Sequence, residues 1–205
     1  MKLTEEFKKN ISDEVSKYEQ KTSGEIVPVL VQASDHYPAS HYRAGILLGL
    51  LGQFGAYVFE LNYSLPFLPL YCFVAFFVLG FFLAKIGTVK RLMTFKSEMN
   101  EEVHQRATEL FFQLDTHSTK DRNGVLIFLT QTERRIIIMG DKGIHEKVGQ
   151  EFWDKIIAEM IPLLKNKQTL EALKLGIQKV GEALAQHYPR HADDKNQLKN
   201  DLFTS

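Results

Sequence analysis

Cysteine is almost absent from this sequence of 205 residues, in which Cys72 is the single example. One cysteine excludes an intramolecular disulfide framework and any zinc site built on several thiolates. An excess of charge is also absent, because 25 Lys and Arg residues balance 25 Asp and Glu residues. A neutral chain lacks the electrostatic footprint of nucleic-acid-binding proteins, so we expect no nucleic-acid partner. No apolar stretch precedes a small-residue cleavage site in the first residues, MKLTEEFKKNISDEV, so we expect no signal peptide.

Charge nearly disappears between Arg43 and Lys85, where Glu60 is the only charged residue. Within this stretch, Ala44–Tyr63 and Pro66–Ala84 each have about 20 residues. A helix of that length covers the roughly 30 Å of a bilayer's hydrocarbon core. We therefore predict a transmembrane helical hairpin over residues 44–84, with the lipid bilayer as its partner. The alternative is a helical hairpin buried in the core of a soluble protein.

Small residues recur on one face of each helix of the predicted hairpin. They are Gly45, Gly49, Gly52 and Ala56 in the first helix, with Gly80 and Ala84 in the second. Such a stripe lets two helix backbones approach closely in lipid. We predict transmembrane packing through these residues, and we expect the hairpin to contact other membrane proteins or a second copy of the chain.

Basic residues flank the predicted hairpin and are missing from its connecting loop. Arg43 precedes the first span, and the residues after the second span include Lys85, Lys90, Arg91 and Lys96, whereas the polar break at residues 62–66 has neither Lys nor Arg. Loops rich in Lys and Arg remain on the cytoplasmic side of a membrane. We expect an integral membrane protein, of the inner or plasma membrane in a bacterium, with the soluble domain and both termini in the cytoplasm.

Outside the hairpin, the hydrophobic pattern alternates between the periods of helices and strands. Helical periodicity covers residues 3–18, 97–114, 152–161 and 169–187, and strand patterns cover residues 25–32, 125–129 and 136–139. Pro28 favours an edge position or a bulge for the first strand. This order predicts an α/β domain with a small mixed sheet flanked by helices. It is discontinuous, covering residues 1–35 and 95–188, and the polar residues 189–205 are expected to be disordered.

Histidine residues do not assemble a recognisable metal motif. His145-Glu146 resembles the start of a zincin helix, but Gly149 occupies the position where the second histidine is required. His36 and His41 are five residues apart beside the first span, and we interpret them as polar residues of the interface.

Two acidic residues stand where strands begin or end. Asp141 follows the last predicted strand and lies between Gly140 and Gly143, where its carboxylate can face a ligand or shape a turn. Asp121 precedes Asn123-Gly124 and has the same two interpretations. These two carboxylates are the candidate metal ligands, and Asp141 is the candidate catalytic residue.

Four segments of the soluble part, taken together, resemble TPM domains. They are Thr22-Ser23-Gly24-Glu25-Ile26, Asn123-Gly124-Val125-Leu126-Ile127, Arg134-Arg135 before Ile136, and Gly140-Asp141-Lys142-Gly143-Ile144. The resemblance covers roughly residues 1–35 and 95–188 and implies an α/β/α sandwich with a small mixed sheet. This chain departs from the family in two places: Arg122 separates Asp121 from Asn123-Gly124, and the predicted hairpin interrupts the domain after its first strand.

The resemblance implies several functions, because TPM domains include acid phosphatases, photosystem repair factors, calcium-binding proteins and receptor accessory proteins. Our leading hypothesis is non-enzymatic: a membrane-anchored TPM-like domain that binds, helps assemble or assists other membrane proteins. The alternative is a divalent-metal-dependent acid phosphatase acting on phosphomonoesters. In that case Asp141 and Asp121 would hold Ca²⁺ or Mg²⁺, which polarises the phosphoryl oxygen.

Overall fold

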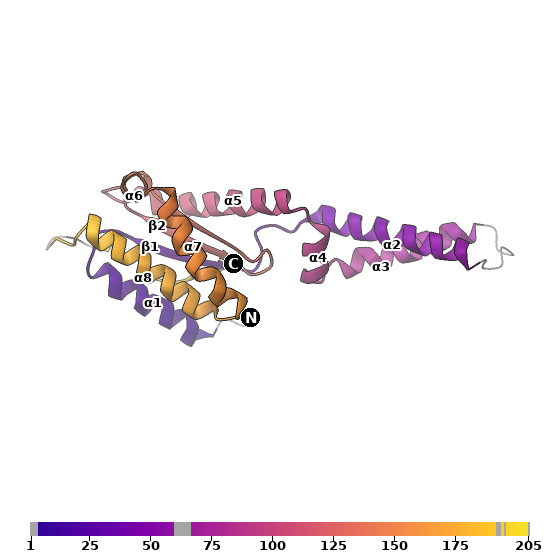
Figure 1. The fold of residues 1–205 in the computed structure, drawn as a ribbon, viewed down its shortest axis with the longest axis horizontal. Coiled ribbons are helices and arrows are strands. Elements are labelled where there is room, and N and C mark those ends of the chain that lie inside the picture. The colour runs from indigo at the N-terminus through magenta and orange to yellow at the C-terminus, as the bar shows by residue number, and fades with distance from the viewer. Residues whose placement is uncertain (1–3, 60–66, 192–193, 195, 205) are drawn as a thin grey trace. The chain divides into compact units, whose positions relative to one another are not determined.

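The computed structural model describes residues 4–59, 67–191, 194 and 196–204 (Figure 1). Its helices are α1 Glu5–Glu19, α2 Pro38–Val58, α3 Leu68–Leu83, α4 Gly87–Met93, α5 Lys96–Gln113, α6 Lys142–Val148, α7 Gln150–Lys165 and α8 Thr169–His187, with a short 3-10 turn at Thr116–Ser118. Its strands are β1 Ile26–Val31, β2 Val125–Thr130, β3 Arg135–Gly140 and β4 Phe203–Thr204. The chain divides into two compact units, one of Met1–Ser34 with Val103–Ser205 and the other of Asp35–Glu102.

The first unit contains a mixed sheet of four strands in the order β3-β2-β1-β4. Strands β1 and β2 are parallel, with Ile26 opposite Val125, while β2 and β3 are antiparallel. Parallel strands need a long crossover connection, and here the whole second unit and α5 lie between β1 and β2 in the chain. The predicted α/β fold with a small mixed sheet is confirmed.

Helices cover both faces of this sheet. On one face, side chains of α1, α7 and α8 pack with alternate residues of the strands, among them Ile26, Ile127 and Ile138. On the other face, α5 packs against the remaining strand residues, such as Val29 and Phe128. Strands β1 and β2 are buried along their whole length, because both faces are covered. That burial is why their sequences read as continuous apolar runs.

The C-terminal segment differs from the expectation of disorder for residues 189–205. Phe203 and Thr204 form β4, which pairs in parallel with Val29 and Leu30 of β1. A two-residue strand carries almost no periodic signal, so the sequence pattern could not reveal it. Pro28 lies outside this short pairing, which is consistent with its missing N–H group. Residues 192, 193, 195 and 205 lie outside the described residues.

The second unit is a pair of helices, α2 and α3, followed by α4 and the start of α5. Pro38 begins α2, where its fixed φ suits the first turn of a helix. Among the described residues, no single helix has both the length and the apolarity to cross a membrane; α3 and α4 meet these criteria only together, and a bend of 110° separates them. The predicted polar break at residues 62–66, and Glu60 beside it, lie outside the described residues.

Candidate functional site

Asp141, the predicted catalytic residue, is a buried carboxylate with two partners. It stands directly before α6, where its Oδ1 atom accepts a hydrogen bond of 2.7 Å from the Lys142 N–H group. Its Oδ2 atom lies 2.8 Å from Nε of Arg122. The Asp141 side chain is 4% exposed, whereas that of Arg122 is 55% exposed. The guanidinium therefore neutralises the carboxylate from the solvent side.

Asp121, the second predicted ligand, is exposed at the surface. Its backbone carbonyl lies in a tight contact with Gly143, because a Cβ atom at Gly143 would stand 2.6 Å from that oxygen. The Gly143 N–H group also donates a hydrogen bond of 2.9 Å to the Arg122 carbonyl. Because Gly143 has no side chain, the loop at the start of α6 packs directly against the backbone of Asp121 and Arg122. In the described part of the chain, no group of three His, Cys, Asp or Glu side chains is placed to hold a metal ion.

Asn123 joins two of the segments that resemble TPM domains. It is fully buried, and its backbone N–H group donates to Oγ1 of Thr119 at 3.0 Å. Its side-chain Nδ2 atom lies 3.5 Å from Oγ of Ser23, at the limit of a hydrogen bond. The next strand begins with the Val125 N–H group donating to the Glu25 carbonyl at 2.8 Å. These contacts bring together, in one loop cluster, a segment that precedes the second unit in the chain and a segment that follows it.

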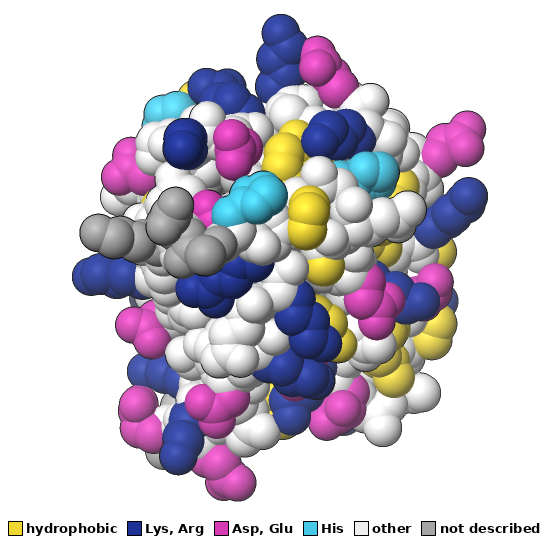
Figure 2. All heavy atoms as spheres, turned by 90° about the vertical axis from the view of Figure 1, so that its left-hand side faces the viewer, with side chains coloured by type: hydrophobic (Ala, Val, Ile, Leu, Met, Phe, Trp, Pro, Cys, Tyr) yellow, Lys and Arg dark blue, Asp and Glu magenta, His cyan; other side chains and the backbone are white. Residues whose placement is uncertain are grey.

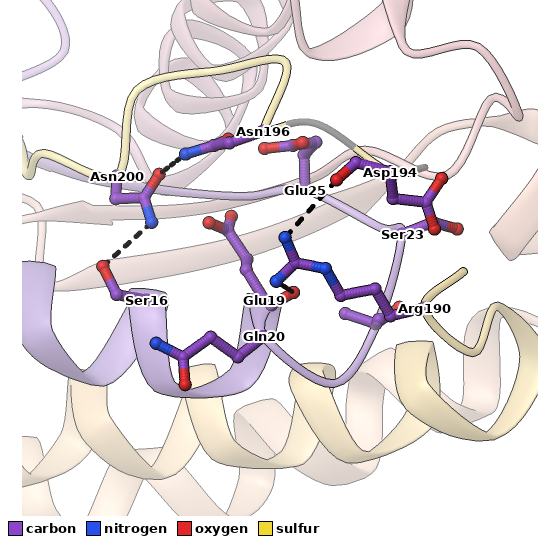
Figure 3. A pocket seen from close by; sticks show the side chains of 10 residues that line it. Ser16, Glu19, Gln20, Ser23, Glu25, Arg190, Asp194, Asn196 and Asn200 are labelled. Carbon is purple, nitrogen blue, oxygen red and sulfur yellow. Dashed lines mark hydrogen bonds between the residues drawn. The ribbon is translucent and has the colours of Figure 1, made fainter. Parts of the chain in front are cut away.

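A pocket that the sequence analysis missed lies between the end of α1, the loop before β1 and the C-terminal segment (Figure 3). Its volume is about 160 Å³. The lining side chains are polar or charged: Ser16, Glu19, Gln20, Thr22, Ser23, Glu25, Arg190, Asp194, Asn196 and Asn200. Six of these residues lie within the first 25 residues of the chain and four lie beyond the end of α8, so only the tertiary fold assembles the pocket.

Two buried glutamates form the floor of this pocket. Glu19 accepts a hydrogen bond of 3.0 Å from the Ile26 N–H group through Oε1. Glu25 accepts from the N–H groups of Gln197 at 2.8 Å and Leu198 at 3.3 Å. The Oε2 atom of Glu19 is buried and has no hydrogen-bond partner among the described residues. Arg190 approaches from the rim, where its guanidinium donates at 3.4 Å to the Glu19 carbonyl (Figure 3).

Burial changes the protonation of both carboxyl groups. It raises the pKa of Glu19 from 4.5 to about 8, against the opposing effect of the hydrogen bond from Ile26, and the nearby Glu25 charge raises it further. Burial also raises the pKa of Glu25, while the N–H groups of Gln197 and Leu198 oppose that shift. At neutral pH, Glu19 is therefore protonated. We interpret the pair as the docking point of the C-terminal segment.

Two of the histidines considered in the sequence, His41 and His145, have structural partners. His145, whose zinc motif the sequence excludes, accepts a hydrogen bond of 3.1 Å at Nδ1 from Nε1 of the buried Trp153. Nδ1 of His41 lies 3.0 Å from the Phe81 carbonyl, and the His41 ring packs on that of Phe81. Each of these two histidines therefore contacts residues of its own unit and has a role in packing.

The six small residues predicted for membrane packing lie mostly at the contact between α2 and α3. A Cβ atom at Gly45 would stand 2.9 Å from the Phe77 ring, and one at Gly49 would stand 2.8 Å from the Phe73 ring. Gly52 meets Phe76 in the same way, and Gly80 faces the Ala44 carbonyl, where a Cβ atom would stand at 2.5 Å. Ala56 and Ala84 are buried. Phenylalanine rings of α3, which the sequence analysis did not consider, thus fill the space above the glycines of α2.

Helices α2 and α3 also carry large apolar side chains that are at least partly exposed. These exposed residues are Ile46, Leu47, Leu50, Leu51, Phe54, Tyr57, Val58, Leu70, Tyr71, Val74, Phe76, Val78, Leu79, Phe82 and Leu83. Exposed apolar patches beyond a few hundred Å² mark binding surfaces for proteins or membranes. By contrast, the face of the first unit in Figure 2 intersperses Lys and Arg with Asp and Glu side chains.

Comparison with known proteins supports the fold and part of the resemblance. Residues 84–183 match the family model of the TPM domain. The chain is also similar to the solved NMR structure of the BA42 protein from the psychrophilic bacterium Bizionia argentinensis. The two are 24% identical with a TM-score of 0.63, and the similarity covers 100% of this chain and 97% of that one. That similarity supports the fold alone, and no curated protein matches this chain.

Proposed function

We propose that this protein is a membrane-anchored TPM-domain module that binds or assists other membrane proteins. The observation that supports the anchor is the band of exposed apolar side chains around α2 and α3. Helices in water place an apolar stripe on one side only, whereas these helices are apolar on the faces turned away from each other as well. Lipid acyl chains are the environment in which such faces carry no free-energy penalty.

The contact between α2 and α3 supports the same proposal. Glycines 45, 49 and 52 let the phenylalanines of α3 approach the α2 backbone closely. Small residues at a helix contact are typical of helix pairs in membranes, where packing rather than water exclusion drives association. The charge distribution supports an orientation with both ends of the hairpin, and hence the α/β unit, in the cytoplasm, because Arg43 and the basic residues after Ala84 flank the hairpin.

The binding role follows from the kind of site that the α/β unit offers. A TPM domain is compatible with an accessory module or with a phosphatase-like one. The polar pocket at Glu19 and Glu25 is already engaged by the chain's own C-terminal segment, and Asp141 is engaged by Arg122. These internal contacts favour a structural role for the buried acids over a catalytic one, so we place the binding or accessory role first.

The anchor is tested by changing the exposed apolar faces. Leu50, Leu51 and Leu79 are 54%, 55% and 50% exposed, so replacing them together with glutamate changes the outward faces more than the packing inside the hairpin. If the hairpin lies in a bilayer, the triple variant should appear in the supernatant after alkaline carbonate extraction while the unchanged protein stays in the membrane pellet. A charged side chain near the bilayer centre costs about 3 kcal/mol by insertion scales, which is enough to prevent stable insertion of a hairpin carrying three.

A matched control uses exposed apolar residues of the α/β unit. Phe112→Glu with Ile161→Glu introduces the same kind of change away from the hairpin, and this variant should remain in the membrane pellet. Release of the unchanged protein by carbonate would contradict the anchor. Site-specific cross-linking from the α/β unit in native membranes tests the accessory role, which fails if no membrane protein is recovered.

A further inference from the structure

The chain turns sharply where it leaves α3. Helices α3 and α4 are bent by 110° relative to each other across the short break between Leu83 and Gly87 (Figure 1). Helix α4 is held in this orientation by packing against α2. A helix at 110° to the axis of α3 departs by 20° from a right angle, so α4 runs nearly perpendicular to α3.

Arg43 of α2 fixes the far end of this turn. Its guanidinium donates a hydrogen bond of 3.1 Å to the Met93 carbonyl and forms an ion pair of 2.7 Å with Glu98. The same group lies over the Phe95 ring, 4.5 Å from its centre. Three contacts from one side chain therefore hold residues 93–98 against the start of α2. We call residues 85–96 the elbow segment.

The elbow segment combines exposed apolar and basic side chains. Ile86, Leu92 and Phe95 are 53%, 76% and 65% exposed. The basic residues are Lys85, Lys90, Arg91 and Lys96, and the first acidic residue after Lys85 is Glu98. Arg91, Lys85 and Lys96 are exposed and Lys90 is half-buried. A short segment with this composition has both parts of an interfacial anchor, namely apolar side chains for the acyl boundary and cations for lipid phosphates.

We propose that the elbow segment binds the anionic headgroup surface of the bilayer, with α4 lying in the plane of that surface. This inference rests on the membrane anchor proposed above. When α3 runs along the bilayer normal, the 110° bend lays α4 within 20° of the membrane plane, at the level where the apolar faces of α2 and α3 end. Leu92 and Phe95 enter the headgroup region, while the Lys and Arg side chains extend along it to the phosphates.

The position of Leu92 is measured with an environment-sensitive fluorophore. Leu92→Cys is labelled in the full-length chain, with Cys72→Ser to leave a single thiol. The labelled protein is reconstituted into vesicles of phosphatidylcholine alone and into vesicles that also contain phosphatidylglycerol. We expect blue-shifted, stronger emission with the anionic lipid, and its reversal by high salt, because electrostatic attraction to headgroups is screened.

Charge variants separate headgroup binding from the packing of the elbow. Each Lys or Arg replaced by Gln should weaken the bound state about fivefold, as expected for a basic side chain at an anionic membrane surface. The full variant, which should lose the shift, replaces Lys85, Lys90, Arg91 and Lys96. A matched control removes four exposed lysines of the α/β unit and should keep the shift; these are Lys9, Lys120, Lys155 and Lys165.

The outcomes distinguish this inference from the anchor on which it rests. Emission typical of water in both kinds of vesicle, with the protein resistant to carbonate extraction, overturns headgroup binding and leaves the anchor intact. Blue-shifted emission of equal strength in vesicles with and without phosphatidylglycerol overturns the proposed attraction between the basic side chains and anionic headgroups. Release of the protein from both kinds of vesicle by carbonate overturns the anchor and the elbow binding together.

Discussion

The carboxylate of Glu25, at the start of β1, accepts a hydrogen bond of 2.8 Å from the backbone N–H group of Gln197, 172 residues later in the chain. The neighbouring Leu198 N–H group donates to the same side chain at 3.3 Å. Two N–H groups of an otherwise irregular segment are thus satisfied by one buried acid. This contact precedes β4 and holds the C-terminal segment against the edge of the sheet.

Replacing Glu25 should therefore release the C-terminal segment. We expect Glu25→Ala to lower the free energy of unfolding by about 1–3 kcal/mol, because it leaves two donors without their acceptor. Limited proteolysis should then cleave within residues 189–204 faster than in the unchanged protein. Glu182→Ala, at an exposed position of α8, is the control and should stay within about 0.5 kcal/mol. Equal cleavage rates in both variants would show that Glu25 does not hold the segment.

Protonation of Glu19 should make stability fall as pH rises. Its pKa is raised from 4.5 to about 8 in the folded state, so the folded protein holds a proton that the unfolded chain has lost. The stability from this group is complete below pH 4.5 and disappears as pH rises through about 8. The raised pKa of Glu25 acts with the same sign. Denaturant unfolding between pH 5 and 9 measures the slope.

Glu19→Gln separates this effect from the other titrating groups. The amide keeps an oxygen for the Ile26 N–H group but cannot ionise, so the decline in stability towards pH 8 should become shallower. A Glu5→Gln variant, which changes an exposed residue of the same helix, should retain the full slope. Parallel curves for the unchanged protein and Glu19→Gln would contradict a buried, protonated Glu19.

Asp141 should matter for stability. Asp141→Ala removes the ion pair with Arg122 and the acceptor for Lys142 N–H at the start of α6. We expect a loss of about 1–3 kcal/mol in urea unfolding, typical of a lost cap together with a disrupted buried carboxylate. Asp121→Ala, at an exposed position, should change stability by less than about 0.5 kcal/mol.

The same pair of variants tests the phosphatase alternative. Hydrolysis of a phosphomonoester is measured with Ca²⁺, with Mg²⁺ and with a chelator. Metal-dependent turnover that both Asp141→Ala and Asp121→Ala abolish would favour the enzyme. If the protein has the proposed binding role, neither Ca²⁺ nor Mg²⁺ raises the rate of hydrolysis above the rate measured with the chelator.

Gly80 should be essential for the close contact of α2 and α3. A Cβ atom at Gly80 would stand 2.5 Å from the Ala44 backbone carbonyl, which cannot move without shifting α2. We expect Gly80→Val to reduce the thermal stability of the helices in detergent, with a cost of about 1–3 kcal/mol for forced separation. Gly55→Ala is the control, because nothing lies within 4 Å of its Cβ position. Circular dichroism melting compares the variants, and equal melting curves would contradict the observed packing.

The sequence alone determined the local structure of this protein. Strand runs such as Val125–Leu129 and the helical stripe of residues 169–187 carry periodicities that follow from the faces they bury, so they fall on β2 and α8. The interruption of the α/β domain was also visible, because a nearly uncharged stretch between Arg43 and Lys85 cannot belong to an amphipathic layer. The segments that resemble TPM domains were recognisable because turns and loop contacts depend on glycine and asparagine at fixed positions.

Only the tertiary structure decided which polar groups meet. Glu19 belongs to no motif of the sequence, and Glu25 was noted only as part of the segment Thr22–Ile26. Burial and a C-terminal segment from the other end of the chain bring the two carboxyl groups together in one pocket. Asp141 was singled out as a ligand, and its pairing with Arg122 arises because the antiparallel β2 and β3 bring the loop before β2 beside the end of β3. The 110° bend between α3 and α4 could not be predicted either, because the seven residues of α4 are too few to show a hydrophobic periodicity. Contacts between distant segments are set by the whole packing of the chain, which no local pattern of side chains encodes.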